Sequence, residues 1–395
     1  MGKNKAVQDI TLKNPAPSTG YGKGETMTPR QRWQNIFHFK PVDRIFNMEF
    51  GWWSDTLKRW HNEGLPEEID TIGKGDRFFN FDLMLYVPVK LGLIPSFERK
   101  ILEQTDRYIV IQDESGVISK QFTDGTSTIP HYIKFPIENR NDWLEFKKRL
   151  NPETSRYPCE KEWQDFKKIA ENSEYPVIIG GGSLFGWIRG WMGFENCLMA
   201  FYDQPDLIDE MIDYICDFVL RVDERALNEV RIDAVGMWED MAFKTQPMIS
   251  PALFERFLVP RYKKMSERFK KAGIDLIFID CDGNINELVE LWLDAGINIM
   301  FPLEINSGSD PVKLRKKFGK RVLLMGGVDK KALIAGPEAI DRELERLKPV
   351  VEEGGYIPHV DHRVPPDVSL KNYMYYLRRK KEVFNIFDWK IPDIG

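Results

Sequence analysis

The second half of the chain alternates short apolar runs with helix-like segments, and this alternation restricts the possible folds more than any other feature. From Asp233 onward, the order strand then helix recurs four times. The predicted helices begin with proline and are followed by glycine, residues that suit the first helical turn and the position past the last one. Repeats of this kind imply parallel strands joined by right-handed helical crossovers.

Two architectures fit such a repeat, a closed barrel and an open doubly wound sheet. A doubly wound nucleotide-binding sheet favours a GxGxxG loop after its first strand, and this chain has none there. The 395 residues exceed the roughly 250 that a (β/α)8 barrel needs. We therefore predict an α/β fold, a single (β/α)8 TIM-type barrel domain over residues 27–395. Five of its strands are expected near residues 233–238, 275–280, 298–303, 322–326 and 355–359.

Two regions lie outside the regular repeat. Residues 1–26 are polar and are interpreted as a flexible N-terminal arm. Residues from about 85 to 175 are interpreted as an insertion. Within them, VIQDESGVISKQFTDGTSTIPHYIKFPI alternates polar and apolar residues around a DG pair, which predicts an antiparallel hairpin. Such an insertion either shapes a substrate pocket or is plain elaboration.

Local signals predict where individual helices begin and end. Thr28 is expected to cap a helix that starts at Pro29. A single helix is expected from Pro251 to the glycine at position 273, whereas Pro349 is expected to kink its helix or end it early. The basic run Arg378–Lys381 is interpreted as the solvated face of a terminal helix.

Composition narrows the function classes. The net charge is −5 with acids and bases interspersed, so nucleic acid is not expected as the main partner. No segment approaches the ~20 apolar residues of a membrane-spanning helix, and the first residues lack the apolar core of a signal peptide. The four cysteines form no CxxC pair, which favours reduced thiols. We expect a cytoplasmic protein.

Polar residues follow the predicted strands at the points where they end. In a (β/α) barrel the active site lies at the carboxyl ends of the strands. Clustered carboxylates repel one another, so a cation or a cationic substrate is needed to hold them together. Five successive strands place acids and histidines at this rim: Glu239 and Asp240 after Trp238, then Asp280 and Asp282, Glu304, Asp329, and finally His359, Asp361 and His362.

Each of these residues also has an ordinary structural interpretation. Either Asp280 or Asp282 could cap the following helix, and Asp329 could cap the helix that begins KKAL. Glu304 could pair with a lysine or arginine, and one of the two histidines could only orient a neighbour. Cys281 should point away from the flanking aspartates if the strand alternation continues, so we interpret it as structural.

Several stretches resemble one known superfamily. MTPRQRWQNIFHFKPVDRIFNMEFGWW, EDMAFKTQPMISPALFERFLVPRYKK, IDCDGNINELVELWLDAGINIMFPLEI, LMGGVDKKAL and GGYIPHVDHRVPPDVSLKNY are similar to the uroporphyrinogen-decarboxylase superfamily, over most of residues 27–385. Its true decarboxylases carry an arginine-containing motif near the N-terminus that holds substrate carboxylates. Here the matching stretch reads NMEFGWWSD, without arginine and with two tryptophans, so decarboxylation of a polyanionic substrate is not expected.

The resemblance extends to the other branch of the superfamily, the zinc-dependent methyltransferases that work with corrinoid proteins. Some of these use a His-x-Cys-Gly motif, an acid on the next strand and a Cys on the last. In this chain Asp280-Cys281-Asp282-Gly283 stands at the first motif, Glu304 at the second position and His362 at the last. The resemblance therefore implies a zinc ion held by Asp280, Glu304 and His362. Carboxylates in place of thiolates bind zinc more weakly and disfavour thiol methylation.

The resemblance is nearest to enzymes that demethylate aryl methyl ethers in anaerobic bacteria. It implies transfer of a methyl group from a small methylated donor, an aromatic methyl ether, to the Co(I) corrinoid of a partner protein. Asp282 and Glu239 are the catalytic candidates, with Asp282 as an acid or a support for the metal. Glu239 and Asp240 are candidates to anchor a ring hydroxyl or a protonated substrate. The ring itself is expected between tryptophans: Trp52, Trp53 and Trp238.

Other interpretations remain open. Since adjacent residues of an extended segment point to opposite sides, at most one of Trp52 and Trp53 is expected to line the site. A methylated amine donor would also favour tryptophan walls, through cation–π attraction. A methylated thiol donor, a non-catalytic ligand-binding paralogue and a homodimer are further alternatives.

Overall fold

The computed structural model describes residues 26–123 and 130–394. The predicted arm, up to residue 25, and the DG pair at positions 124–125 lie outside these ranges. The chain divides into two compact units, where a single barrel domain was expected. The larger unit comprises residues 84–323, and the smaller one combines the chain before residue 84 with the chain from residue 324 onward.

The larger unit contains five parallel strands in the order β1 (Leu85–Tyr86), β6 (Val177–Gly180), β7 (Ala234–Trp238), β8 (Ile277–Asp280) and β9 (Ile299–Leu303). Most residues of β6 and β7 and every residue of β9 are buried, as expected for strands covered on both faces. The expected strands near 233–238, 275–280 and 298–303 are therefore confirmed as parallel neighbours.

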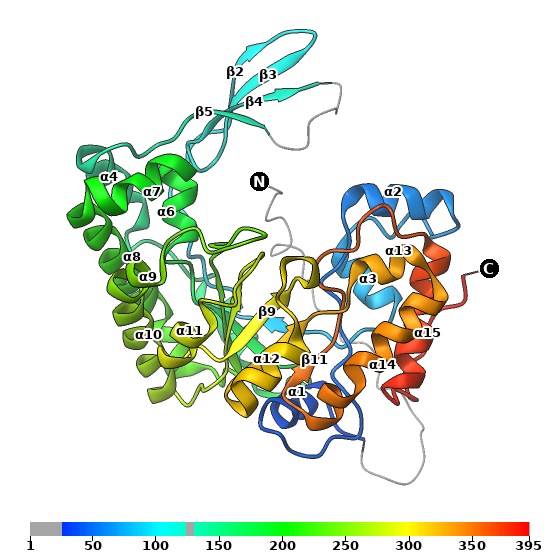
Figure 1. The fold of residues 1–395 in the computed structure, drawn as a ribbon. Helices are drawn as coiled ribbons and strands as arrows, with labels where there is room; N and C mark the ends of the chain where they lie inside the picture. The colour runs from blue at the N-terminus through cyan, green and yellow to red at the C-terminus, as the bar shows by residue number, and fades with distance from the viewer. Residues whose placement is uncertain (1–25, 124–129, 395) are drawn as a thin grey trace. The chain divides into compact units, whose positions relative to one another are not determined.

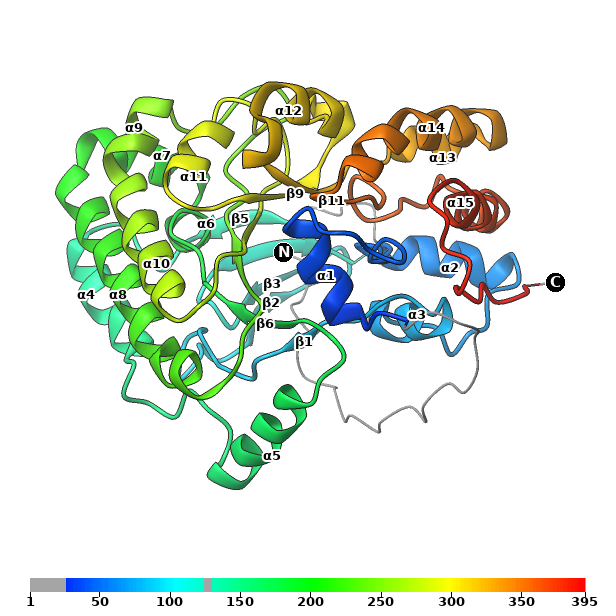
Figure 2. The same ribbon diagram turned by 90° about the horizontal axis from the view of Figure 1, so that it is seen from below.

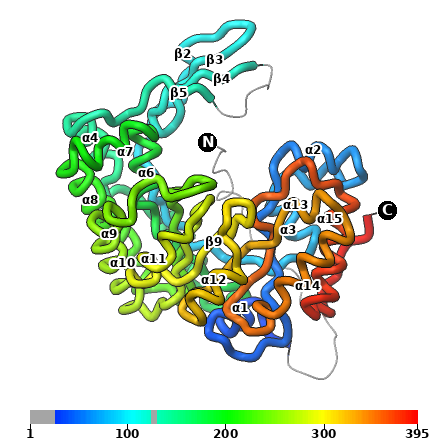
Figure 3. The backbone as a smooth tube through the Cα atoms, viewed as in Figure 1, coloured from blue at the N-terminus to red at the C-terminus, as the bar shows by residue number. Residues whose placement is uncertain are grey.

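Helices surround these strands (Figures 1 and 2). Figure 3 follows the chain from α6 through α7 into the long helix α8. The helices of the larger unit are α4 (Arg140–Phe146), α5 (Glu160–Glu171), α6 (Gly186–Met192), α7 (Phe194–Asp203), α8 (Pro205–Glu229), α9 (Pro251–Phe257), α10 (Val259–Lys271), α11 (Val289–Asp294) and α12 (Pro311–Phe318), with short 3-10 turns η1 (Lys147–Leu150), η2 (Ile305–Ser307) and η3 (Gly319–Arg321).

Two helices that contain proline differ from expectation. The single helix expected from Pro251 to position 273 is divided at Leu258 into α9 and α10. Pro260 explains the division, because it has no N–H and its ring would clash with the carbonyl four residues earlier in a continuous helix. Pro349, by contrast, lies inside α14 (Pro337–Glu353), which continues past it. Of the two alternatives expected at Pro349, a kink or an early end, the early end is wrong.

The predicted antiparallel insertion is confirmed and is larger than one hairpin. The strands β2 (Lys100–Gln104), β3 (Tyr108–Gln112), β4 (Ile118–Phe122) and β5 (His131–Lys134) pair in sequence order as a four-stranded antiparallel sheet. Figure 1 shows this sheet at the end of the larger unit that also carries α4, α6 and α7. We refer to it as the inserted sheet.

The smaller unit pairs β10 (Leu323–Gly326) with β11 (Tyr356–Ile357) in parallel, which confirms the last two expected strands as neighbours. Its helices are α1 (Pro29–Phe37), α2 (Ser54–Asn62), α3 (Ile72–Phe78), α13 (Lys330–Ala335), α14 and α15 (Leu370–Val383). Thr28 caps α1 in a capping box with Gln31, and Asp329 caps α13 through the amide of Lys331; both expectations are confirmed.

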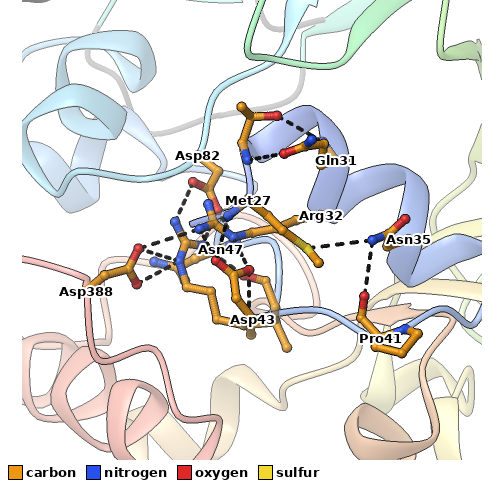
Figure 4. Close-up of polar contacts among 12 residues, drawn as sticks. Met27, Gln31, Arg32, Asn35, Pro41, Asp43, Asn47, Asp82 and Asp388 are labelled. Carbon is orange, nitrogen blue, oxygen red and sulfur yellow. Dashed lines mark hydrogen bonds and ion pairs between the residues drawn. The ribbon is translucent and has the colours of Figure 1, made fainter. Parts of the chain in front are cut away.

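Ion pairs join distant parts of the smaller unit. Arg32 binds Asp43 through Nε and Nη2 at 2.7 and 2.6 Å, and Arg44 binds Asp82 as well as Asp388. Figure 4 shows Asp43, Asp82 and Asp388 gathered around these guanidinium groups. Arg32 also lies 3.7 Å from Asp388. Because Arg32 lies in α1 and Asp388 follows α15, these contacts join the two chain segments of the smaller unit.

One charged residue contradicts the expected solvated face of α15. Lys380 is fully buried and donates to Glu49 Oε1 at 2.7 Å and to the carbonyl of Met48 at 3.0 Å. Tyr376 donates to the same carboxylate oxygen at 2.7 Å. Lys380 is therefore part of a buried polar core, since a buried charge needs both an opposite charge and hydrogen bonds.

Candidate active site

Three aspartates meet at the carboxyl ends of β7 and β8. Carboxylate oxygens of Asp240, Asp280 and Asp282 all lie within 4.8 Å of one another. The strand register explains the meeting, because Trp238 of β7 stands opposite Asp280 of β8. We call these three residues the acidic triad. It includes three predicted site residues: Asp280 at the end of β8, Asp282 in the turn after β8, and Asp240 after β7.

The turn after β8 has a backbone that only glycine accommodates. Gly283 has a φ of +88°, and a Cβ there would lie 2.6 Å from the carbonyl oxygens of Ala242 and Phe243. The amide of Asp282 donates to Asp240 Oδ1 at 3.3 Å. Asp240 itself has a φ of +42°, which is uncommon for a residue other than glycine. The two strand ends are thus packed closely enough to bring the carboxylates together.

The triad is electrostatically strained. Burial, followed by the negative charge of Asp282, raises the pKa of Asp240 to about 6, while the amide of Asp282 and the charge of Arg189 act in the opposite direction. Like charges at this distance disfavour simultaneous ionisation. A proton or a cation shared by the three carboxylates would relieve the repulsion.

Glu304 lies beside this turn rather than within the triad. Its Oε2 accepts a hydrogen bond from the amide of Gly283 at 3.0 Å and one from the Ser307 hydroxyl at 3.4 Å. Neither predicted helix cap after β8 is observed, since α11 starts only at Val289 after Leu288. Asp280 and Asp282 are therefore not used to begin that helix.

Glu239 is enclosed by protein donors. Its side chain is fully buried, and the amides of Leu184, Phe185 and Gly186 donate to it at 2.8, 2.7 and 2.9 Å. The hydroxyls of Ser183 and Tyr262 add bonds of 2.9 and 2.8 Å. Burial raises the pKa of Glu239, and these donors oppose the rise. Such contacts favour a role in holding the start of α6 over direct contact with a substrate.

Cys281 is structural, as its place in the strand predicts. It is fully buried, its Sγ accepts the amide of Met241 at 3.3 Å, and burial raises its thiol pKa well above the usual range. A protonated, inaccessible thiol is a poor metal ligand. The donors at this site are consequently carboxylate oxygens, which fit a hard divalent cation well and zinc less selectively.

Sequence reasoning missed Arg189 of α6. Its guanidinium lies 5.7 Å from the ring centroid of Trp238, and Nη2 lies 3.9 Å from Asp240 Oδ2. Its charge also acts to lower the pKa of Tyr132 in β5, against the burial that raises it. Arg189 follows the end of β6 by nine residues. A search for polar residues after strand ends would have found it only if it had continued into the first turns of the next helix.

The remaining predicted residues lie in the smaller unit. Trp53 is 41% exposed and stacks on His362 with ring centroids 5.4 Å apart, and Arg363 lies 5.1 Å from the same ring. Trp52 is only 2% exposed and packs against Trp60. The two tryptophans therefore point to opposite sides, as the alternation predicts, and Trp52 is a core residue where substrate contact was among the expectations.

The other two rim residues near His362 are inaccessible. His359 is fully buried, with Nδ1 2.8 Å from the carbonyl of Val360, and burial lowers its pKa to about 3. Asp361 is fully buried and lies 3.4 Å from Lys330 Nζ. His359 therefore fits the expectation that one of the two histidines only orients a neighbour.

The fold and the site define a class of protein: parallel strands with crossover helices and reactive side chains at the carboxyl ends of the strands, an arrangement typical of enzymes. The family model described as Uroporphyrinogen decarboxylase (URO-D) matches residues 121–383, more than half of the chain. The chain belongs to this family.

Curated relatives are distant. A uroporphyrinogen decarboxylase of Salinibacter ruber is 22% identical over 197 residues, covering 49% of this chain and 50% of that protein. One from Magnetococcus marinus is 26% identical over 220 residues, covering 53% and 55%. The chain spans about half the length of the curated relatives it matches.

A solved structure resembles almost the whole chain. A methyltransferase from Methanosarcina mazei aligns with a TM-score of 0.58 and 15% identity, covering 90% of this chain and 99% of that one. At this identity the likeness concerns the fold. Among the described residues, no helix is both long enough and apolar enough to cross a membrane.

Proposed function

We propose that this chain is a methyltransferase that takes the methyl group of an aromatic methyl ether and passes it to the Co(I) corrinoid of a partner protein. The observation that carries the proposal is the acidic triad at the strand ends beside the exposed ring of Trp238. The fold is shared with a protein described as a methyltransferase. The absence of arginine from NMEFGWWSD disfavours a polyanionic substrate.

The difficult part of this reaction is the departure of a phenolate. Bound at the triad, a divalent ion such as zinc would supply Lewis acidity at the ether oxygen. Asp240, Asp280 and Asp282 would hold it, and Glu304 would position the turn that carries Asp282 through its bond to Gly283. The metal role that the resemblance gives to His362, in the smaller unit, stays a prediction. A proton held by Asp282 or its neighbours would serve the same purpose as general acid.

The chain's other residues bind and orient the donor. Trp238 offers a ring face for stacking, and Trp53 is the exposed candidate of the smaller unit. Glu239 fixes the start of α6 against the end of β7. The methyl acceptor belongs to the partner protein, so a corrinoid protein is part of the proposal, as is closure of the strands into an eight-stranded barrel.

The test is methyl transfer to a purified corrinoid protein while aromatic ethers, methylated amines and methylated thiols are supplied in turn. Transfer from the ethers supports the proposal. Transfer from another donor class alone, or from no donor when metal is bound, contradicts it. Metal content is measured in parallel, with His362→Ala expected to lower it and Asp294→Asn, an exposed partner of Arg321, as the control.

A further inference from the structure

Arg189 has more hydrogen-bonding capacity than the described residues around it use. A guanidinium carries five N–H donors. Across the described ranges, its recorded polar contact is the 3.9 Å approach to Asp240, which is the outer limit of an ion pair. Its Nε is inaccessible to solvent and has no hydrogen-bond partner among the described residues. The side chain as a whole is 24% exposed, so an acceptor on a ligand would meet the outer Nη nitrogens of the guanidinium.

The guanidinium lies beside an aromatic surface. Trp238 is 37% exposed, and its ring centroid is 5.7 Å from Arg189 Cζ. Phe243 is also exposed and meets Phe194 edge to face at 5.3 Å. Planar cations and exposed rings together suit a flat ligand with an acceptor at its edge.

The position of Arg189 is set in advance by buried contacts. Glu239, next to Trp238, accepts three amides at the start of α6, and Arg189 lies on that helix. Ser183 reinforces this corner by accepting the amide of Trp187 at 3.1 Å. Arg189 and Trp238 are therefore held in place before a ligand binds. Binding then costs less conformational entropy, which favours it.

Neutralising Asp240 is an incomplete explanation for Arg189. A guanidinium that serves a carboxylate usually donates two parallel bonds at 2.7–2.9 Å, as Arg261 does with Asp213 at 2.6 and 2.9 Å. Within residues 26–123 and 130–394, no acceptor bonds Nε of Arg189, and Asp240 stays 3.9 Å from Nη2.

We propose that Arg189 and Trp238 form a specificity site for an anionic oxygen, a carboxylate or phenolate, carried by an aromatic methyl donor. This deepens the proposed function and rests on it. The charged edge of the ring would lie against Arg189, whose positive charge it shares with Asp240 of the acidic triad, and the methyl ether would lie toward Asp280 and Asp282. Arg189 is thus a binding residue that orients the donor.

The probes for this site are benzoate and its neutral amide, benzamide, whose binding is measured by calorimetry without any corrinoid protein. Wild-type protein should bind benzoate more tightly. Arg189→Met should weaken benzoate binding roughly ten- to hundredfold and leave benzamide nearly unchanged. Arg189→Lys should restore part of the preference, which separates lost charge from lost folding; melting temperatures check the fold of each variant.

Arg256 offers a matched control. It also lies 3.9 Å from an aspartate, Asp209, and 4.4 Å from an aromatic ring, Phe257, but on the exposed side of α9. Arg256→Met should leave both probes unaffected. Equal binding of the two probes to wild type, no binding of either, or equal losses in Arg189→Met would overturn the proposal.

Failure of the site and failure of the proposed function are distinguishable. If benzoate binding depends on Arg189 but no methyl group is transferred from methoxybenzoate, the function is wrong and the anion site stands. If transfer proceeds and Arg189→Met leaves the KM for methoxybenzoate unchanged relative to neutral methoxybenzamide, the anion site is wrong and the function stands.

Discussion

The amide of Asp282 donates to Oδ1 of Asp240 at 3.3 Å, so the ends of β8 and β7 are joined at the point where both carry a carboxylate. Asp280 completes the group, with oxygens of all three within 4.8 Å. The same hydrogen bond that brings the strand ends together brings like charges together, and this conflict is open to experiment.

Asp282→Asn should affect stability in opposite directions with and without metal. In chelator, the variant should melt at a higher temperature than wild type, because one of three mutually repelling charges is removed. With zinc or manganese added, wild type should gain more stability, and the metal affinity of the variant should be lower by about tenfold or more. Melting curves with metal titration measure both effects. Identical behaviour of Asp282→Asn and the surface control Asp294→Asn would contradict a metal site here.

Glu239→Gln should destabilise the protein more than Tyr262→Phe. The amide nitrogen of glutamine would face donors where the carboxylate accepts five bonds, leaving buried groups unsatisfied, at a cost of about 1–3 kcal/mol for each such group. Tyr262→Phe removes one donor and should cost about 1 kcal/mol. Urea unfolding compares the two variants, and equal, small losses would show that the start of α6 is held by other contacts.

Asp223 predicts a pH dependence of stability. It lies in α8, is fully buried, and neither carboxylate oxygen has a hydrogen-bond partner among the described residues; burial raises its pKa well above the usual value. The folded protein therefore keeps a proton that the unfolded chain releases near pH 4. Stability should fall as the pH rises from about 4 toward the folded-state pKa.

The variant Asp223→Asn lacks the carboxyl group and should therefore lack this contribution to the pH dependence of stability. The difference in unfolding free energy between Asp223→Asn and wild type should grow with pH over that window, in favour of the variant. Asp217→Asn on the exposed side of the same helix is the control. A difference independent of pH would mean that Asp223 ionises alike in both states.

The adjacent tryptophans should differ in what their loss costs. Trp52→Ala empties a core position and should lower stability by about 3–5 kcal/mol. Trp53→Ala should change stability by about 0.5 kcal/mol or less. If Trp53 contacts the donor, its loss should weaken donor binding by the free energy of the lost apolar contact and by about 0.5–1.5 kcal/mol more for the lost ring stacking. Metal content should stay unchanged. Trp238→Ala is the companion variant in the larger unit. Unaltered donor affinity in both Trp53→Ala and Trp238→Ala would show that the ring binds elsewhere.

Local features were predictable because their causes lie within a few residues. Thr28 and Asp329 cap helices as expected, since capping needs only a side-chain oxygen and amides two or three residues later. The alternation of side chains along an extended segment predicted that Trp52 and Trp53 point to opposite sides and that Cys281 points inward, and the burial of these residues agrees. The parallel order of the later strands followed from the spacing of apolar runs and helices.

Other features depend on which distant segments meet, and only the tertiary structure decided them. Lys380 belongs to a basic run, yet Glu49 and Tyr376 surround its ammonium with a buried acid and hydroxyl. Glu239 ends a strand like its neighbour Asp240, but the start of α6 encloses it with donors. Arg189 lies beside Trp238 because α6 packs against the end of β7, which the sequence alone does not show. The sequence by itself determined which residues could carry charge or cap a helix, because those properties are local; the tertiary structure determined which charges share an environment, because electrostatic energy and solvation depend on distance and burial rather than on position along the chain.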